Sequence, residues 1–203
     1  TNAQPTVLTS DSLALVDLYN STNGASWTDK TNWLSAPVNA WFGITVTANR
    51  VTAITLSNNN VTGPLPTSIG NLTALLTLDL NSNQLSGGIP SGIGNLLALQ
   101  TLNLYNNQLT GNIPTNIGNL SALVLLQLDS NQLTGSIPSS IGNLLSLQYL
   151  ILGFNQLTGS IPTSIGNLST LLGLTLGFNQ LSGSIPSSIG NLSVLQYLFL
   201  FNN

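Results

Sequence analysis

The sequence predicts an α/β solenoid, in which stacked coils place a parallel β-sheet on one face, 3₁₀ or irregular backbone on the outer side and a helical cap at the N-terminus. A 24-residue unit recurs from about Val51 onward without insertion or deletion, a period typical of solenoids. Each unit alternates apolar and polar residues over one short stretch, and only the first fifty residues lie outside the repeat. The Ile-Gly-Asn-Leu segment of the unit begins at Ile69, Ile93, Ile117, Ile141, Ile165 and Ile189.

The repeat divides the chain into two parts. Residues 1–50 form the predicted N-terminal cap, with a polar tail at residues 1–5, a helix and a Trp-rich segment. Residues 51–203 form the array, with six complete repeats and a partial seventh. The last leucines of the array have no following coil, so we expect a longer parent protein or end-to-end self-association.

The predicted helix of the cap covers residues 10–19. Thr9 or Ser10 can cap it, and Asp11 suits the positive end of the helix dipole. The apolar side of this helix is formed by Leu15, Leu18 and Tyr19.

Three tryptophans follow the helix in an irregular segment: Trp27, Trp33 and Trp41. We expect them to cover the apolar end of the first repeat, because the open end of a solenoid must be covered. An aromatic platform on which sugars stack is the alternative interpretation.

Within each repeat, two inward leucines alternate with polar residues, which predicts a short strand. Each strand follows its predecessor around one coil, so the strands are expected to stack into a parallel sheet. They are predicted to centre on Leu56, Leu80, Leu104, Leu128, Leu152, Leu176 and Leu200.

An asparagine follows each predicted strand, where the chain turns inside the coil. An amide side chain can satisfy both a backbone donor and a backbone acceptor, so we predict a buried ladder with a structural role. Glycine and proline then bend the chain, and the Ile-Gly-Asn-Leu segment returns in short 3₁₀ turns. The ladder residues are Asn59, Asn83, Asn107, Asn131, Asn155, Asn179 and Asn203.

The pattern LxxLxLxxNxLxGxIPxxIGNL resembles leucine-rich repeats of the plant-specific type, whose signature Leu-x-Gly-x-Ile-Pro stands at residues 109–114. The resemblance covers residues 51–203, implies a right-handed leucine-rich repeat coil, and extends to cap-like segments at residues 14–20 and 41–52. Plant members normally carry cap cysteines; this cysteine-free chain is more similar to secreted or surface proteins of bacteria or microbial eukaryotes. Known relatives bind proteins, peptides or glycans, inhibit cell-wall hydrolases, mediate adhesion or bind ice.

Composition argues against several kinds of partner. Charged residues make up 3% of the chain, where roughly a quarter is usual. The array has no basic stripe to bind phosphates, so nucleic acid and anionic membrane surfaces are not expected partners. No apolar run reaches the roughly 18 to 20 residues of a membrane span, so we expect no membrane insertion.

Enzyme chemistry is not expected either. The chain has no histidine and no cysteine, and the array has two carboxylates, Asp79 and Asp129. At strand spacing these lie roughly 10 Å apart, beyond the roughly 6.5 to 9.5 Å of an inverting glycosidase pair. No neighbour is evident that would raise either pKa. We therefore expect no catalytic residues, no cofactor and no metal site.

The strand face is the first candidate binding surface. Its outward positions become less polar toward the C-terminal half, and exposed aromatic patches usually mark binding. Through them the chain would act as an extracellular or cell-surface module for recognition or adhesion, with a protein or glycan partner. Local packing of Phe154 and Phe178 beside the asparagine ladder, with further sequence covering the last strand, is the alternative. The candidate residues are Tyr105, Tyr149, Ile151, Phe154, Phe178, Tyr197, Phe199 and Phe201.

Two columns of hydroxyl residues form the second candidate surface. On an uncharged, rigid surface, straight rows spaced roughly 4.7 to 4.9 Å apart could order water, which makes ice the alternative ligand. The simpler interpretation is that Ser and Thr suit these turns. The first hydroxyl column is Thr62, Ser86, Thr110, Thr134, Thr158 and Ser182, and the second is Thr67, Ser91, Thr115, Ser139, Thr163 and Ser187.

Overall fold

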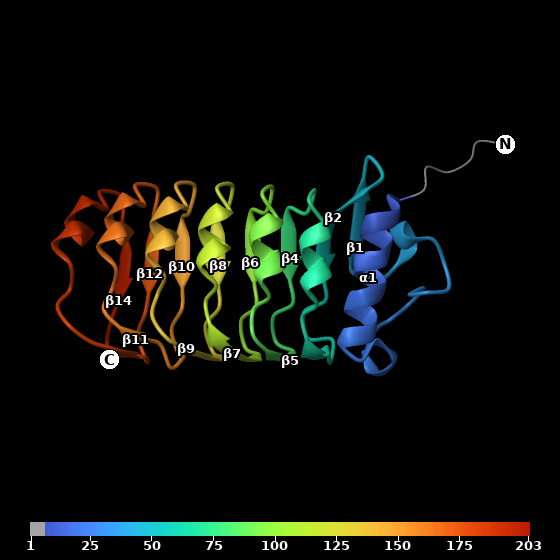
Figure 1. Ribbon diagram of the computed structural model, residues 1–203, viewed down its shortest axis with the longest axis horizontal. Helices are drawn as coiled ribbons and strands as arrows, with labels where there is room; N and C mark the ends of the chain where they lie inside the picture. The colour runs from blue at the N-terminus through green and yellow to red at the C-terminus, as the bar shows by residue number, and fades with distance from the viewer. Residues whose placement is uncertain (1–6) are drawn as a thin grey trace.

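The computed structural model describes residues 7–203, so the predicted polar tail at residues 1–5 lies outside the described part. The molecule is elongated, with coils stacked along its long axis and the N-terminal helix at one end (Figure 1). The predicted solenoid architecture is confirmed.

One eight-stranded sheet runs along the molecule in the order β1-β2-β4-β6-β8-β10-β12-β14. Its strands are β1 (Ile44–Thr47), β2 (Arg50–Thr55), β4 (Thr77–Asp79), β6 (Thr101–Asn103), β8 (Leu125–Gln127), β10 (Tyr149–Ile151), β12 (Gly173–Thr175) and β14 (Tyr197–Phe199). From β2 onward the neighbours are parallel, and residues 24 positions apart face each other, as Leu102 and Leu126 do. The predicted parallel sheet is therefore confirmed.

The strands centre two residues earlier than predicted. Strand β6 ends at Asn103, and the buried Leu104 lies just beyond it. The carbonyl of Leu104 accepts hydrogen bonds from the side chains of Asn107 and Asn131, at 3.1 and 3.0 Å. The Leu104 N–H still donates to the carbonyl of Gln127 at 2.9 Å, but its own carbonyl is taken by the asparagine side chains, so the strand ends before the second leucine.

Strand β1 pairs antiparallel with β2 and covers the N-terminal edge of the sheet. The turn between them holds Ala48 and Asn49 at φ values of 48° and 65°. Two successive residues with positive φ are typical of a tight hairpin turn. The repeat pattern did not predict this strand, because it belongs to the cap.

A second set of short parallel strands follows the asparagine turn, where only a bend was predicted. These strands are β3 (Thr62–Pro64), β5 (Gln84–Gly87), β7 (Gln108–Asn112) and β9 (Gln132–Thr134) in one sheet, and β11 (Thr158–Gly159) and β13 (Gln180–Leu181) in another. A single bridge between Ser136 and Thr158 links the two sheets.

The outer side of each coil is a 3₁₀ helix that begins directly after a proline, as predicted. These helices are η3 (Thr67–Asn71), η4 (Ser91–Asn95), η5 (Thr115–Asn119), η6 (Ser139–Asn143), η7 (Thr163–Asn167) and η8 (Ser187–Asn191); η1 (Gly24–Ser26) and η2 (Val38–Ala40) lie in the cap.

The glycine of each outer helix allows neighbouring coils to approach closely. A Cβ atom on Gly118 would lie 2.4 Å from the carbonyl oxygen of Ser140 in the next coil, and one on Gly142 would lie 2.4 Å from that of Ser164. A Cβ atom on Gly190, in the last coil, would meet nothing within 4 Å. The glycine is therefore required by the contact between coils.

Replacing Gly118 by alanine is expected to lower the free energy of unfolding by about 2 to 3 kcal/mol, because the added methyl group would overlap backbone. Gly190→Ala is the matched control and should leave stability unchanged within about 0.5 kcal/mol. Urea unfolding followed by circular dichroism measures both. Equal midpoints for the two variants would contradict the packing argument.

The asparagine ladder is present as predicted, but it is buried only as far as Asn155, since Asn179 is half-buried and Asn203 is exposed. Asn107 accepts a hydrogen bond from the Leu85 N–H at 2.9 Å and donates to the carbonyls of Leu80 and Leu104 at 3.0 and 3.1 Å. Asn131, Asn155, Asn179 and Asn203 make the same kinds of contact. The ladder thus joins each coil to the coils on either side.

Helix α1 (Thr9–Ser21) is longer than predicted and begins differently. Its N-cap is Leu8, without a side-chain hydrogen bond, so the predicted capping by Thr9 or Ser10 is wrong. Its buried side consists of Asp11, Ala14, Leu15 and Leu18, while Tyr19 is half-buried.

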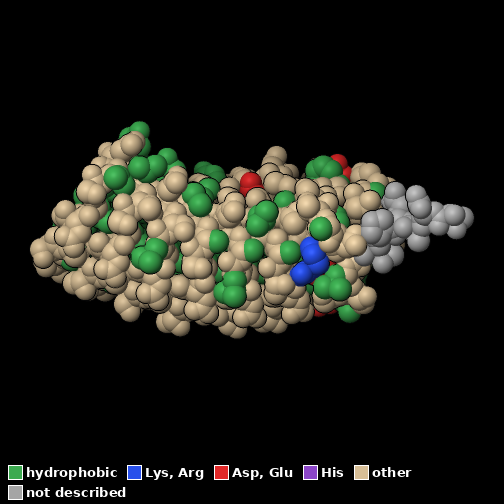
Figure 2. Space-filling view, turned by 90° about the horizontal axis from the view of Figure 1, so that it is seen from above, with side chains coloured by type: hydrophobic (Ala, Val, Ile, Leu, Met, Phe, Trp, Pro, Cys, Tyr) green, Lys and Arg blue, Asp and Glu red, His purple; other side chains and the backbone are tan. Residues whose placement is uncertain are grey.

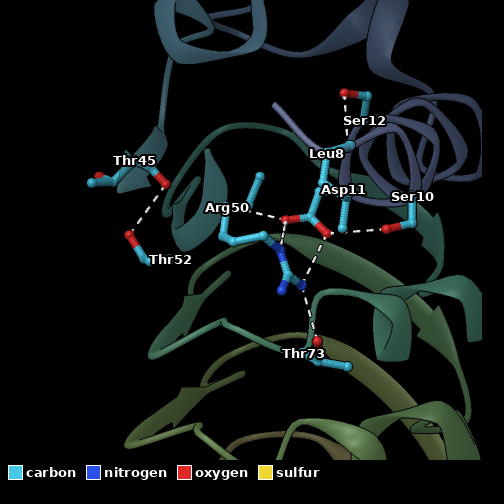
Figure 3. A network of polar contacts seen from close by, with 9 residues as sticks. Leu8, Ser10, Asp11, Ser12, Thr45, Arg50, Thr52 and Thr73 are labelled. Carbon is cyan, nitrogen blue, oxygen red and sulfur yellow. Dashed lines mark hydrogen bonds and ion pairs between the residues drawn. The ribbon is translucent and has the colours of Figure 1, made fainter. Parts of the chain in front are cut away.

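Asp11 has a further role that the sequence did not indicate (Figure 3). Its buried carboxylate forms an ion pair with Arg50, with 3.0 Å between Oδ2 and the guanidinium Nε, and accepts the Val51 N–H at 2.9 Å. Arg50 also donates to the hydroxyl of Thr73 at 2.9 Å. This network fastens the cap helix to the start of the array.

The three tryptophans are buried, with 3%, 5% and 6% of their surfaces exposed for Trp27, Trp33 and Trp41. Each indole N–H donates to a backbone carbonyl, and the rings pack against one another in the core that continues into Ile54. Their predicted covering role is confirmed. A sugar-stacking platform is wrong, because the ring faces are not accessible.

Candidate functional site

The exposed aromatic side chains of the strand face lie at its C-terminal end. In Figure 2 hydrophobic side chains gather along the upper left edge of the molecule, toward the C-terminal coils, and elsewhere they are scattered among uncharged polar side chains and backbone. Tyr149 on β10 and Tyr197 on β14 are exposed, and Gly173 lies between them on β12. A Cβ atom on Gly173 would lie 3.0 Å from the Tyr149 ring, so this ring leans over the glycine.

Four phenylalanines form a continuous cluster beside the ends of these strands, which we call the aromatic shelf: Phe154, Phe178, Phe199 and Phe201. The rings of Phe154 and Phe178 stack with centroids 4.2 Å apart and 15° between their planes. Phe201 meets Phe178 and Phe199 edge to face, at 5.2 and 6.0 Å. All four side chains are exposed, so the shelf offers apolar surface to a partner.

Phe154 and Phe178 have an unfavourable backbone conformation. Their φ values are 50° and 57°, in the left-handed region, which costs a bulky L-residue roughly 1 to 2 kcal/mol. Asparagine adopts this conformation more readily. The equivalent left-handed positions in the other coils are Asn58, Ser82, Asn106, Ser130 and Asn202. Strained residues that remain exposed, here to 53% and 37%, are characteristic of functional surfaces.

Two predicted residues lie at the margin of this surface. Ile151 is half-buried and lies in one row with Thr175 and Phe199 across β10, β12 and β14. Tyr105 is also half-buried and precedes the coil of Phe154 by two coils. The structure therefore brings the four phenylalanines together, flanks them with Tyr149 and Tyr197, and leaves Tyr105 apart.

Asp129 lies between the polar and the aromatic halves of the strand face. It follows β8 closely along the chain, and its carbonyl accepts the Asn106 N–H at 3.1 Å. The side-chain oxygen Oδ1 is buried and has no hydrogen-bond partner in the described part of the chain. Asp79 differs, because its Oδ1 accepts hydrogen bonds from the backbone and side-chain amides of Asn81, at 3.2 and 2.7 Å.

Burial raises the pKa of the Asp129 carboxyl, and a hydrogen bond from Gln127 opposes this only in part. The sequence-based expectation concerned neighbouring groups only, and it is burial rather than a neighbour that raises the pKa of Asp129. Desolvation by the surrounding coils causes this shift, and no charged neighbour is involved. The signal available in the sequence was one of only two carboxylates in an otherwise uncharged array.

Asp129→Asn is expected to stabilise the fold at neutral pH and to have little effect in acid. A raised pKa means that the folded state binds the proton more tightly than the unfolded chain, so the wild type loses stability as pH rises from 3.8 through the folded-state pKa. Asparagine does not ionise and avoids this loss. Urea unfolding at about pH 3 and about pH 7 measures the difference. The same pH dependence in both proteins would contradict the assignment.

The second hydroxyl column occupies the first residue of each outer 3₁₀ helix, from η3 to η8. All six side chains are exposed, and their hydroxyls make no hydrogen bond to another described residue. The following residue of the turn links the coils instead: Ser164 donates to the carbonyl of Ser139 at 2.6 Å, and Ser188 to that of Thr163 at 2.7 Å. The second hydroxyl column is therefore free to contact solvent or a ligand.

The first hydroxyl column does not form straight rows at strand spacing. Across its sheet, residues 22 positions apart face each other, so Thr110 faces Gln132 and Asn112 faces Thr134. Equivalent hydroxyls are shifted by two residues along the strands, which separates them by roughly 8 Å. The predicted spacing of roughly 4.7 to 4.9 Å is wrong for this column, because its sheet pairs out of phase with the repeat.

Shallow grooves lie between this sheet and the outer helices. One has a volume of about 610 Å³ and is lined by hydroxyl and amide side chains together with isoleucine and proline. A second, of about 600 Å³, lies one coil further on. Within residues 7–203, no three side chains of His, Cys, Asp or Glu are placed to hold a metal ion, and no helix is long and apolar enough to cross a membrane.

A sequence model described as Leucine Rich Repeat matches six segments of the chain: residues 50–72, 74–96, 98–120, 122–144, 146–168 and 170–192. A search of curated proteins found no match.

Solved structures with a similar fold include plant receptors and an ice-binding protein. The PEPR1–AtPEP1 complex is 39% identical with a TM-score of 0.88, over 97% of this chain and 28% of that one. The Arabidopsis HAESA ectodomain with an IDA peptide hormone is 33% identical with a TM-score of 0.84, over 95% and 33%. A plant ice-binding protein is 30% identical with a TM-score of 0.81, over 92% and 61%. The chain thus spans about a third of the length of the PEPR1 and HAESA chains.

Proposed function

Because the chain belongs to the leucine-rich repeat family, with repeats of the plant-specific type, we propose that it is an extracellular, non-enzymatic binding module that takes a protein or peptide partner on its strand face. Two similar structures support this proposal, since one is a complex of PEPR1 with AtPEP1 and the other is a receptor kinase ectodomain with a peptide hormone. The observation that carries it is the aromatic shelf, in which exposed phenylalanines are retained in a strained conformation.

The shelf has the properties of an interface core. Aromatic side chains contribute large apolar area with few rotatable bonds, and they dominate the energetics of protein interfaces. The strand face around it carries few charges, so a partner can approach without displacing strongly hydrated groups. Backbone of the parallel sheet below holds Tyr149, Tyr197 and Phe199 at fixed positions, which limits the entropy lost on binding.

The double variant Phe154→Asn/Phe178→Asn is expected to lose binding by tenfold or more while it folds normally. Asparagine suits the left-handed conformation, so relief of backbone strain offsets the missing ring stacking, and stability should change by less than about 1 kcal/mol. Binding is measured with a positional-scanning library of N-acetylated hexapeptide amides, and the best binders are titrated individually.

The control variant is Asn106→Ser, at the equivalent position two coils before Phe154, where binding should not change. A glycan array probed with the same proteins extends the test to carbohydrate partners. Binding by the double variant that equals wild type would exclude the aromatic shelf as the site.

Ice binding is the second candidate function, and the second hydroxyl column favours it. Its six side chains are exposed, uncharged and without hydrogen-bond partners in the described residues, and one similar structure is a plant ice-binding protein. Thermal hysteresis and inhibition of ice recrystallisation test it, with Thr115→Lys/Thr163→Lys as the disrupting variant. Absence of both activities at high protein concentration would exclude this function.

End-to-end assembly is the remaining alternative for the array. Head-to-tail contact between its ends would give filaments, since such contacts do not close on themselves. Light scattering that gives the monomer mass of 21.2 kDa at high concentration would exclude it.

A further inference from the structure

We propose that the aromatic half of the strand face selects a peptide segment without charged side chains, and that it rejects basic as well as acidic side chains wherever they would contact the aromatic shelf. This inference rests on the proposed function of the strand face and names the class of partner that the face takes. The aromatic half is the aromatic shelf together with Tyr149, Ile151, Thr175 and Tyr197.

Charged side chains are absent from the part of the chain that forms this surface. The sequence has no Asp, Glu, Lys or Arg in residues 130–203. Both basic residues, Lys30 and Arg50, lie in the cap, where Arg50 is held by Asp11. Asp129 is the acidic residue that precedes the aromatic half along the chain, and it is half-buried. A charged side chain of a partner would therefore meet no opposite charge on the aromatic half.

The backbone beneath the aromatic half is hydrogen-bonded from coil to coil. The Leu152 N–H donates to the carbonyl of Thr175 at 2.8 Å. The Leu176 N–H donates to the carbonyl of Phe199, also at 2.8 Å. Across these strands a partner therefore meets mainly side chains. Those side chains are aromatic or aliphatic apart from the hydroxyls of Thr175 and the two tyrosines, which can pair with peptide groups but cannot neutralise an ion.

The aromatic rings extend over backbone without side chains and stay accessible. A Cβ atom on Gly173 would lie 3.0 Å from the Tyr149 ring, and one on Gly177 would lie 3.5 Å from the Phe201 ring. Tyr149 and Phe201 remain 36% and 54% exposed. Apolar side chains of a partner can thus be buried against these rings, which is the main source of affinity at such a surface.

Both signs of charge are disfavoured at this surface, but to different extents. Moving an ion out of water costs free energy that an opposite charge or several hydrogen bonds must offset. A cation recovers part of this cost from aromatic ring faces, although Phe154 and Phe178 each have one face covered by the other. An anion meets the negative faces of the rings and recovers nothing. We therefore expect affinity to decrease from uncharged to basic to acidic segments.

The test uses the N-acetylated hexapeptide amides that bind best to the wild-type protein. We expect an uncharged residue at the peptide position where alanine costs the most affinity. At that position, lysine is compared with norleucine and aspartate with asparagine, because each pair differs in charge and little in shape. Lysine should weaken binding about tenfold, and aspartate more than that. The affinity of the uncharged peptide should change by less than about twofold between low and high salt.

Variants of the protein test the same inference from the other side. Thr175→Asp supplies the missing counter-charge within the aromatic half and should make the lysine peptide bind more tightly than the norleucine peptide. Thr175→Val keeps the shape without charge and should retain the wild-type preference. Asn103→Asp is the control, three coils earlier in the same row of the sheet, and should also leave the preference unchanged. Gln148→Glu, at an exposed position next to Tyr149, repeats the test if Thr175→Asp does not fold.

The outcomes separate this inference from the proposed function. Peptides that bind best with a charged contact residue, yet lose affinity in Phe154→Asn/Phe178→Asn, would overturn the exclusion of charge and leave the aromatic shelf as the site. A library from which no peptide binds the wild type would overturn both. Uncharged binders that are weakened by either charge, with lysine preferred only after Thr175→Asp or Gln148→Glu, would establish the selection of an uncharged partner.

Discussion

Replacing Arg50 by methionine is expected to destabilise the protein by about 3 to 5 kcal/mol, because it leaves the carboxylate of Asp11 buried without its counter-ion. Asp11 has no exposed surface, and Arg50 contacts it through two guanidinium nitrogens, at 3.0 and 3.2 Å. The network joins the cap helix to the first strand of the array (Figure 3). Its loss should therefore separate the cap from the coils, and urea unfolding followed by tryptophan fluorescence would detect this because Trp27, Trp33 and Trp41 lie in the cap.

The matched control is Lys30→Met, which makes the same chemical change at an exposed position of the cap. We expect it to alter stability by less than about 0.5 kcal/mol. The double variant Asp11→Asn/Arg50→Met should recover most of the loss, since the amide oxygen can still accept the Val51 N–H. An Arg50→Met protein as stable as Lys30→Met would show that the ion pair does not hold the cap in place.

Asn107→Ala is expected to cost about 2 to 4 kcal/mol, because it removes several buried hydrogen bonds at once. The Leu85 N–H would lose its acceptor, and the carbonyls of Leu80 and Leu104 would each lose one of their two side-chain donors. Hydrogen exchange measured by NMR should show faster exchange at the Leu85 amide than at amides in distant coils. Thermal unfolding gives the total cost.

Asn119→Ala is the control from the same repeat. Asn119 is exposed in the Ile-Gly-Asn-Leu segment, and its side chain makes no hydrogen bond to another described residue. Its replacement should change stability by less than about 0.5 kcal/mol. If the two alanine variants unfolded at the same temperature, the buried ladder would not be a major source of stability.

Much of the fold could be predicted because each coil repeats the same local sequence pattern. Alternating leucines specify an inward-facing strand, an asparagine closes the turn after it, and a proline followed by Ile-Gly-Asn-Leu specifies the outer 3₁₀ helix. Residues 24 positions apart have equivalent environments, so one correctly interpreted coil predicts the others. The sequence placed the four phenylalanines of the aromatic shelf at outward positions but left open whether Phe154 and Phe178 pack locally, and only the structure shows that all four are exposed.

The sequence by itself therefore determined the repeat, the direction of the main sheet and the asparagine ladder. The tertiary structure alone decided the pairing of Asp11 with Arg50, the 22-residue register of the second sheets and the burial of Oδ1 in Asp129. The physical reason is that a periodic sequence shows which residues occupy equivalent positions in successive coils. The register between neighbouring coils of the second sheets, and the contacts between the cap and the array, arise only when the coils pack in three dimensions.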